Sequence, residues 1–386
     1  MELTPVTDAA TAKAFLETAA VINKDDPGWI QPLDKDVEAV FDPGKNKLFR
    51  QGSCARWILK DEEGRLAGRI AAFINKKYRN KGDEQPTGGI GFFECINSPD
   101  AAALLFDQAK AWLQEQGMEA MDGPINFGER LNWWGLLVEG FHEPLYCMNY
   151  NQPYYQTLFE EYGFRPFFNQ ICFALKVRNR LQDKFYERHA RFAQDPDFSA
   201  RMISKKELDK YALDFSTIYN KAWASHQGGK NLEPRQAVQM FRQMKPVIDE
   251  RLVWFIYHKE QPIGCWLNLP DLNQWFKFLH GKFNLLAKLK FLYLKATRKS
   301  KRYVGLVFGI VPEFQGTGVD AFMIVEGANM MQQHTAYEDF EMQWIGDFNP
   351  KMINIAENLG TYRSRRLVTY RYLFDRSKPF KRHPMV

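Results

Sequence analysis

Apolar residues gather along the chain in short runs of strand length and in longer stretches with helical spacing. Runs at 57–60 and 66–68 flank a charged turn, and runs at 254–257 and 262–264 flank a polar one, so each pair predicts a β-hairpin. Helical patterns follow the residues Thr7, Asp100 and Ser204, whose side chains are of the kind that cap helix N-termini. This mixture of strands and helices predicts an α+β fold.

Landmarks of the first half recur in the second half at a nearly constant offset. The glycines that close the two hairpins are 196 residues apart, and two other pairs, a hydroxyl cap and a glycine that ends a late helix, are each 197 apart. The pairs are Gly68 with Gly264, Thr7 with Ser204, and Gly163 with Gly360. So long a period excludes a solenoid. We therefore predict two tandem domains, residues 1–177 and 201–386, joined by a charged linker at 178–200.

Composition narrows the class of protein further. With 45% hydrophobic and 15% aromatic residues in 386, the chain can bury sizeable cores. The five cysteines form no C-x-x-C pair, so neither a disulfide framework nor a cysteine zinc site is predicted, and a reducing, cytoplasmic compartment is expected. No signal peptide and no apolar run of about 18 residues is visible. Paired metal spacing is also missing among the histidines, which are His142, His189, His226, His258, His280, His334 and His383.

The net charge of +6 comes from one segment. Residues 271–303 hold nine basic residues and one acidic residue, a charge of +8, which leaves −2 for the rest of the chain. Basic character this local argues against a nucleic-acid surface.

The same segment contains a predicted amphipathic helix at 284–302. Its apolar residues fall within a stripe of roughly 120° at helical spacing, and a row of basic residues lies beside it. The stripe is formed by Leu285, Leu286, Leu289, Leu292, Tyr293 and Ala296, and the basic row by Lys288, Lys295, Lys299 and Arg302. Either this helix packs on its domain, or it contacts anionic lipid or covers an apolar substrate.

A glycine turn, Val311-Pro312-Glu313-Phe314-Gln315-Gly316-Thr317-Gly318, separates a predicted buried strand at 306–310 from a predicted helix at 319–331. Such a turn is either a plain tight turn or an anion cradle, in which free N–H groups and the helix dipole face a phosphate. The first half has Asn-Ser-Pro-Asp at the matching place, 97–100. A carboxylate there would repel phosphate. A phosphorylated cofactor is therefore expected in the second half.

Residues 123–155 are rich in aromatic side chains with polar ones between them. The segment is either a packing loop between domains or the wall of a ligand pocket. The side chains that we expect to face an acceptor substrate in such a pocket are Asn126, Asn132, Tyr150, Asn151, Tyr154 and Tyr155.

Taken together, these features resemble the GNAT acyltransferase superfamily. The turn at 311–318 is similar to its acyl-CoA motif, Val-x-Pro, two residues, then Gln/Arg-Gly-x-Gly/Ala, while 340–345 and 349–360 resemble the strand and helix that follow it. The resemblance covers nearly the whole chain as two GNAT-like domains, each a mixed, mostly antiparallel sheet flanked by helices. The layout is distantly similar to N-myristoyltransferases and Fem-type aminoacyltransferases, and is similar to bacterial two-domain GNAT proteins that include candidate ceramide-type N-acyltransferases.

The resemblance implies acetyl-CoA or another acyl-CoA as donor, no metal, and direct attack by an amine. Backbone N–H groups near Ile310 and Val311 would polarise the thioester carbonyl. The diphosphate would be held by Gln315, Gly316, Thr317 and Gly318, with Asn349 and Asn354 of the closing helix also near the cofactor.

The resemblance also bears on the acid and the base. The tyrosine that often serves the family as acid is replaced by Ala356 in the second half and by Phe159 in the first, while Glu94 lies on a first-half strand where the family can supply a base. We expect an acyl-CoA-dependent N-acyltransferase acting on a small-molecule or lipid amine. Two alternatives stay open: a non-catalytic CoA-binding or regulatory protein, and a long-chain, ceramide-type enzyme at the membrane surface, contacting it through 284–302.

Overall fold

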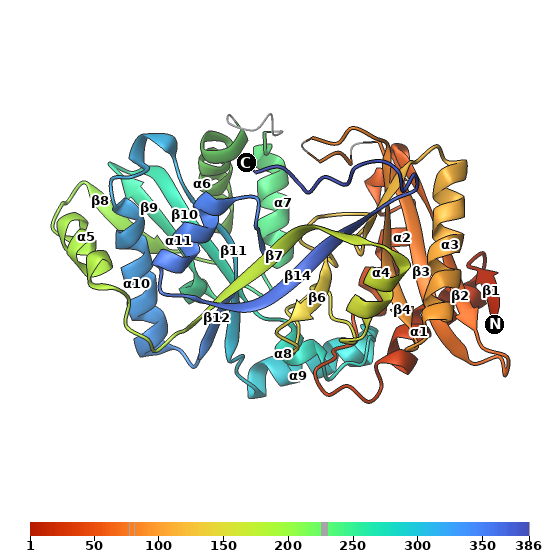
Figure 1. Cartoon of the computed structure of the whole chain (residues 1–386). Coiled ribbons are helices and arrows are strands. Elements are labelled where there is room, and N and C mark those ends of the chain that lie inside the picture. The colour runs from red at the N-terminus through yellow and green to blue at the C-terminus, as the bar shows by residue number, and fades with distance from the viewer. Residues whose placement is uncertain (77, 81, 225–230, 386) are drawn as a thin grey trace.

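The computed structural model describes residues 1–76, 78–80, 82–224 and 231–385, so His226 lies outside the described residues. Within them, the strands form one 14-stranded sheet that runs through the whole molecule (Figure 1). The first half of the chain occupies one end of this sheet and the second half the other, with helices packed along both.

The first half begins with one strand and two helices, continues with three strands, and ends with further strands and two helices. They are β1 (Glu2–Pro5), α1 (Ala9–Ile22), α2 (Asp34–Phe41), β2 (Gly52–Lys60), β3 (Leu66–Asn75), β4 (Thr87–Cys95), α3 (Pro99–Glu115), β5 (Ala120–Gly123), β6 (Leu136–Glu139), α4 (Tyr155–Tyr162) and β7 (Arg165–Lys176). Helix α5 (Asp183–Ala193) follows and leads into the second half.

The second half repeats this order and adds two helices, α8 and α9, between its third and fourth strands. Its elements are β8 (Phe198–Met202), α6 (Leu208–Tyr219), α7 (Pro234–Met244), β9 (Val253–His258), β10 (Gln261–Pro270), α8 (Asn273–Phe276), α9 (Leu285–Thr297), β11 (Arg302–Ile310), α10 (Val319–His334), β12 (Asp339–Met342), β13 (Ile345–Gly346), α11 (Pro350–Asn358) and β14 (Tyr362–Leu373).

The two halves exchange their last strands. The sheet order is β1-β2-β3-β4-β5-β14-β7-β12-β11-β10-β9-β8. Strand β14, which ends the second half, thus pairs with β5 of the first, while β7 pairs with β12 of the second. The exchanged strands also pair with each other, and they cross the middle of the molecule in Figure 1.

The internal repeat is confirmed by where its glycines lie. Gly68 pairs with the last residue of β4 and Gly264 with the last residue of β11, and a side chain at either glycine would clash with its neighbours. Gly163 and Gly360 follow α4 and α11 with φ of 108° and 80°, the left-handed conformation that glycine adopts at helix ends. The α+β fold with two similar halves is therefore confirmed. The division at 178–200 stays a prediction about folding units.

Helix starts were predicted less well than strands. The cap of α1 is Asp8, which accepts from the Thr11 amide at 2.8 Å. For α3 the cap is Ser98 and not Asp100, because the helix begins two residues earlier than expected, at Pro99. Ser204 does not cap α6, because that helix begins only at Leu208 and the residue at its cap position is Glu207. The earlier start of α3 is explained by Pro99, which fits the first helical position because its missing N–H costs nothing there.

Most of the core lies between the sheet and the helices of each half, in separate apolar clusters. The predicted linker is part of this packing, since Phe185 of α5 is buried against α10. No helix in the described part of the chain is long and apolar enough to cross a membrane.

Candidate functional site

A cavity of about 460 Å³ opens where strands β11 and β12 part. The two strands run parallel and pair only as far as Gly305 and Met342. Beyond that point β11 stays paired with β10 but, among the described residues, has no strand partner on the side of the gap, which helices α5, α10 and α11 enclose. Most of the lining is apolar, and it includes Leu181, Phe185, Leu306, Phe308, Ile324, Ala328, Phe340, Met342, Trp344, Ile355 and Leu359.

The glycine turn stands at the start of α10, the helix that lines this cavity. Gly316 and Gly318 have φ of 75° and 91°, so both need the left-handed freedom of glycine. Within the described residues, no protein acceptor is found for the N–H of either glycine, and a Cβ at Gly316 would meet nothing within 4 Å. The neighbouring amides are held weakly or within the turn: Thr317 N–H lies 3.5 Å from the Phe314 carbonyl. The turn can therefore offer N–H groups to an anion.

Two basic side chains from α5 approach the same place. The Arg188 side chain covers Gly318, since a Cβ there would lie 3.1 Å from Arg188 Cδ. Lys184 donates to Asn358 Oδ1 of α11 at 3.1 Å, and both cations line the cavity. Sequence reasoning missed them because it treated α5 as part of a linker. The amphipathic pattern around Phe185 was the signal that this helix packs on the fold.

Three other groups expected to bind the cofactor already form hydrogen bonds within the protein. The Val311 amide donates to the Ile263 carbonyl at 2.9 Å, so it is not free to polarise a thioester. The Gln315 side chain donates to the Ile310 carbonyl at 2.9 Å. The Asn349 side chain caps α11 by accepting from the Met352 amide at 3.2 Å.

Asn354 is exposed on α11 and does not line the cavity. The strand residues that do line it lie earlier in β11. At Leu306 the pairing with β10 shifts by one residue, so the strand bulges there.

Glu94 lies in the first half, in a second and much smaller cavity of about 50 Å³. Its carboxylate accepts from Tyr155 Oη at 2.8 Å and Asn23 Nδ2 at 3.0 Å, and it lies 3.4 Å from Arg69. Burial raises the pKa of Glu94, and the Arg69 guanidinium only partly offsets that rise. Tyr150 also lines this cavity, with its hydroxyl donating to Asp26 at 3.0 Å.

The remaining residues expected in the acceptor pocket hold the protein's own backbone or lie elsewhere. Asn151 lines the small cavity but exchanges hydrogen bonds with both backbone groups of Leu137. Tyr154 donates to the Cys95 carbonyl at 2.7 Å. Asn126 is buried with an unpaired Oδ1, and neither it nor Asn132 lines the small cavity.

The structure does not bring Glu94 and the glycine turn together. Glu94 belongs to β4, and β5, β14, β7 and β12 separate that strand from β11. Five strand spacings amount to about 24 Å. A carboxylate at that distance cannot remove a proton from an amine at the β11 gap. The expectation that Glu94 serves as base for this cavity is therefore not supported.

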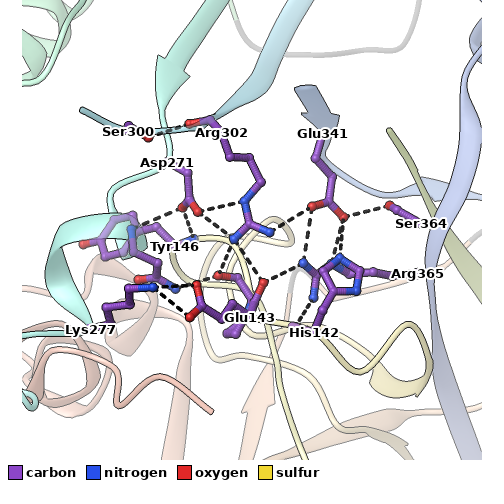
Figure 2. A network of polar contacts seen from close by, with 12 residues as sticks. His142, Glu143, Tyr146, Asp271, Lys277, Ser300, Arg302, Glu341, Ser364 and Arg365 are labelled. Atoms are coloured by element: carbon purple, nitrogen blue, oxygen red, sulfur yellow. Dashed lines mark hydrogen bonds and ion pairs between the residues drawn. The ribbon is translucent and has the colours of Figure 1, made fainter. Parts of the chain in front are cut away.

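A polar network lies beside the gap instead (Figure 2). Glu341 of β12 pairs with Arg365 of β14 at 2.7 Å and with Arg302 of β11 at 3.5 Å. Burial alone would raise the pKa of Glu341, but Arg365, Arg302 and the Ser364 hydroxyl together outweigh it and hold this pKa below its usual range. Arg302 also pairs with buried Asp271 at 2.7 Å.

His142, in the loop after β6, completes the network. Its Nε2 lies 4.0 Å from Glu341 Oε1, and its side chain is 47% exposed. Burial and the nearby Arg365 lower the pKa of His142, so the imidazole is neutral at pH 7. Glu341 stands between Phe340 and Met342, which line the cavity, so it faces the opposite side of the sheet. His142, with its neutral imidazole, thus lies on the side of the sheet away from the cavity, near the point where β11 and β12 part.

The paired halves, the gap between β11 and β12 and the glycine turn at α10 define a tandem GNAT-fold protein. No family model matches the chain. Over 365 residues it is 26% identical to a bacterial ceramide synthase of Caulobacter vibrioides, covering 93% of this chain and 94% of that protein.

Two solved structures share the fold. One is a tandem GNAT protein from the clavulanic acid biosynthesis pathway, with a TM-score of 0.54 and 13% identity, covering 98% of this chain and 99% of that one. The other is a GCN5-related N-acetyltransferase from Sphaerobacter thermophilus, with a TM-score of 0.50 and 12% identity, covering 100% of this chain and 98% of that one.

Proposed function

We propose that this protein is an acyltransferase that moves an acyl group from a CoA thioester to an amine. The observation that carries the proposal is the glycine turn, with its free amides and Arg188, at one end of an apolar cavity. A diphosphate fits the amides and the guanidinium, because both donate hydrogen bonds to phosphate oxygens. The rest of the donor would then run along the gap between β11 and β12.

The apolar lining favours a long acyl chain over an acetyl group. An acetyl group needs little apolar wall, whereas a fatty chain is stabilised by each buried CH₂. This agrees with the similarity in sequence to a protein named a bacterial ceramide synthase, whose name implies an acyl group on a lipid amine. We therefore favour a lipid amine as acceptor.

In the proposed reaction the amine nitrogen attacks the thioester carbonyl, the C–S bond breaks, and CoA leaves as the thiolate. The amine must lose one proton, and His142 is our candidate to accept it, directly or through water. Glu341 would orient the imidazole and stabilise its protonated form. The bulge at Leu306 marks the part of β11 where backbone amides would face the carbonyl.

The test is CoA affinity, measured by calorimetric titration. Replacing Gly316 by Val both strains a left-handed residue and fills the turn, so we expect at least tenfold weaker binding. The matched control is Gly117→Val, since Gly117 has φ of 78° and equal open space but lies at the end of α3.

The same titration tests Arg188. We expect Arg188→Met to weaken CoA binding roughly tenfold or more, because a hydrogen bond to a charged group contributes about 1.5–3 kcal/mol. Arg191→Met is its control on the same helix, since Arg191 does not line the cavity. Unchanged affinity in both Gly316→Val and Arg188→Met would refute the proposed donor site.

A further inference from the structure

Helix α9 exposes a continuous apolar face. Five large side chains on it are between 56% and 75% exposed, and helical spacing places them within an arc of roughly 120°. They are Leu285, Leu286, Leu289, Leu292 and Tyr293. Soluble proteins commonly expose such residues singly, but a gathered face of this kind indicates an interaction surface.

The opposite face of α9 is fixed to the protein. Ala287, Phe291 and Leu294 are buried in a cluster with Trp275 and Phe276 of α8, and the Asn284 side chain caps the helix by accepting from the Ala287 amide at 3.0 Å. The helix therefore cannot turn its apolar stripe inward. Helix α9 thus packs on its domain, as one of the two interpretations of the sequence had it, but through residues off the stripe.

Basic residues without acidic partners surround this face. Among the described residues, five cations of the segment have no carboxylate within ion-pair distance, and α9 itself contains no acidic residue. These cations are Lys288, Lys290, Lys295, Arg298 and Lys299. By contrast, Lys277, Lys282 and Lys301 pair with Glu143, Asp34 and Glu338. Two of these cations, Lys290 and Lys295, donate to the carbonyls of Phe278 and Pro246, so their charges stay uncompensated by any carboxylate of the described residues. An apolar arc flanked by such cations is complementary to a surface of anionic lipid, where acyl chains meet negative headgroups.

Helix α9 is anchored to the loop that lines the first-half cavity. Trp29, Ile30 and Pro32 line the cavity that holds Glu94, and the next residue, Leu33, packs in the cluster beneath α9. Asp34 then pairs with Lys282 at 2.7 Å, just before α9 begins. One loop therefore runs from that cavity to the buried side of α9, along the lower edge of the molecule in Figure 1.

We propose that the exposed face of α9 docks this protein on an anionic lipid bilayer. This deepens the proposed function and rests on it for the lipid nature of the acceptor. Docking would place the face against the headgroups, so that a lipid amine could reach the protein without leaving the bilayer. The surface needs no bound donor, so docking and CoA binding can be measured separately.

The experiment is flotation of the full chain with vesicles of phosphatidylcholine alone or with about one-third phosphatidylglycerol. We expect binding to the anionic vesicles, weaker binding to neutral ones, and loss of binding in high salt. The double variant Leu289→Glu/Leu292→Glu should bind at least tenfold more weakly. The control is Leu213→Glu, which replaces an exposed leucine by the same charged residue on α6, where the side chain is 46% exposed. This variant should bind as wild type does.

A charge-reversed variant, Lys288→Glu/Lys299→Glu, gives an independent reading, with an expected loss of roughly fivefold for each cation removed. All variants should keep wild-type CoA affinity, which shows that they fold and separates this test from that of the donor site. Equal binding by wild type and both double variants, or no binding to anionic vesicles, would overturn the proposal. So would a wild-type dimer in light scattering that Leu289→Glu/Leu292→Glu converts to monomer, since the face would then be covered by a second copy.

Discussion

At the scale of single residues, surroundings decide what a side chain can do. Glu94 and His142 are both possible bases, but Glu94 is enclosed by Arg69, Tyr155 and Asn23, whereas His142 is half exposed beside Glu341. The sequence suggested Glu94 because its position on a strand matches a family pattern. It could not reveal His142, because the partner Glu341 lies 199 residues away in the chain.

The two candidates predict different pH profiles. A base works only when deprotonated, so activity should fall as pH drops through the pKa of His142, which lies below its usual 6.5. We expect His142→Gln to remove this limb and to lower kcat by about 10²–10⁴-fold. Initial rates of CoA release between pH 5 and 9 would check it.

Glu94→Gln is the comparison variant in that experiment. It should keep the wild-type profile, because Glu94 lies far from the β11 gap. If Glu94→Gln instead abolishes the acid limb while His142→Gln leaves it intact, the assignment of the base to His142 is wrong.

At the scale of elements, the sequence predicted which strands and helices form better than it predicted which face of each helix packs on the protein. Hairpins, the strand before the glycine turn and α10 all follow from hydrophobic spacing, and they formed close to where we expected them. The periodicity of α9 was also correct, but both of its faces carry apolar residues, so spacing alone could not say which one packs. Nor could it show that α5 brings Arg188 to the glycine turn, because that contact depends on the packing of α5 on α10.

The face of α10 that lines the cavity yields a prediction on donor length. Ile324 and Ala328 are one turn apart and both line the cavity, so a larger side chain at 328 would shorten it. We expect Ala328→Trp to lower kcat/KM for palmitoyl-CoA at least tenfold more than for acetyl-CoA. Steady-state rates with a series of acyl-CoA esters would measure this.

Ala190→Trp on α5 controls for the added indole, since Ala190 is exposed and does not line the cavity. An equal loss for short and long esters in Ala328→Trp would mean that this part of the cavity does not hold the acyl chain.

At the scale of the whole molecule, the exchanged strands join the two halves into one structure. Strands β5 and β12 each obtain their neighbour toward the middle of the sheet from the other half. The loop at His142 and Glu143 is also held across the halves, because Arg365 donates to both of its carbonyls at 2.7 Å. The repeat in the sequence revealed two similar halves. The repeat could not reveal the exchange, because an apolar strand can pair equally well with the last strand of its own half or with that of the other half.

We therefore predict that the protein unfolds in a single transition. Scanning calorimetry should give a ratio of calorimetric to van't Hoff enthalpy close to one. Fragments 1–180 and 181–386 should each be unstable alone, since each would lack one strand of its sheet. Two separate transitions, or two stable fragments, would show that the halves fold independently.

The exchange also sets an order of events during synthesis. Strand β5 ends at Gly123, but its neighbour β14 ends at Leu373, about 250 residues later. At roughly 5–20 residues per second, the ribosome needs on the order of 10–50 s to supply that neighbour. During this interval the edge of β5 is open to pairing with other nascent chains. Translation speed and chaperone supply should therefore govern the yield of native protein more strongly than they would for two self-contained halves.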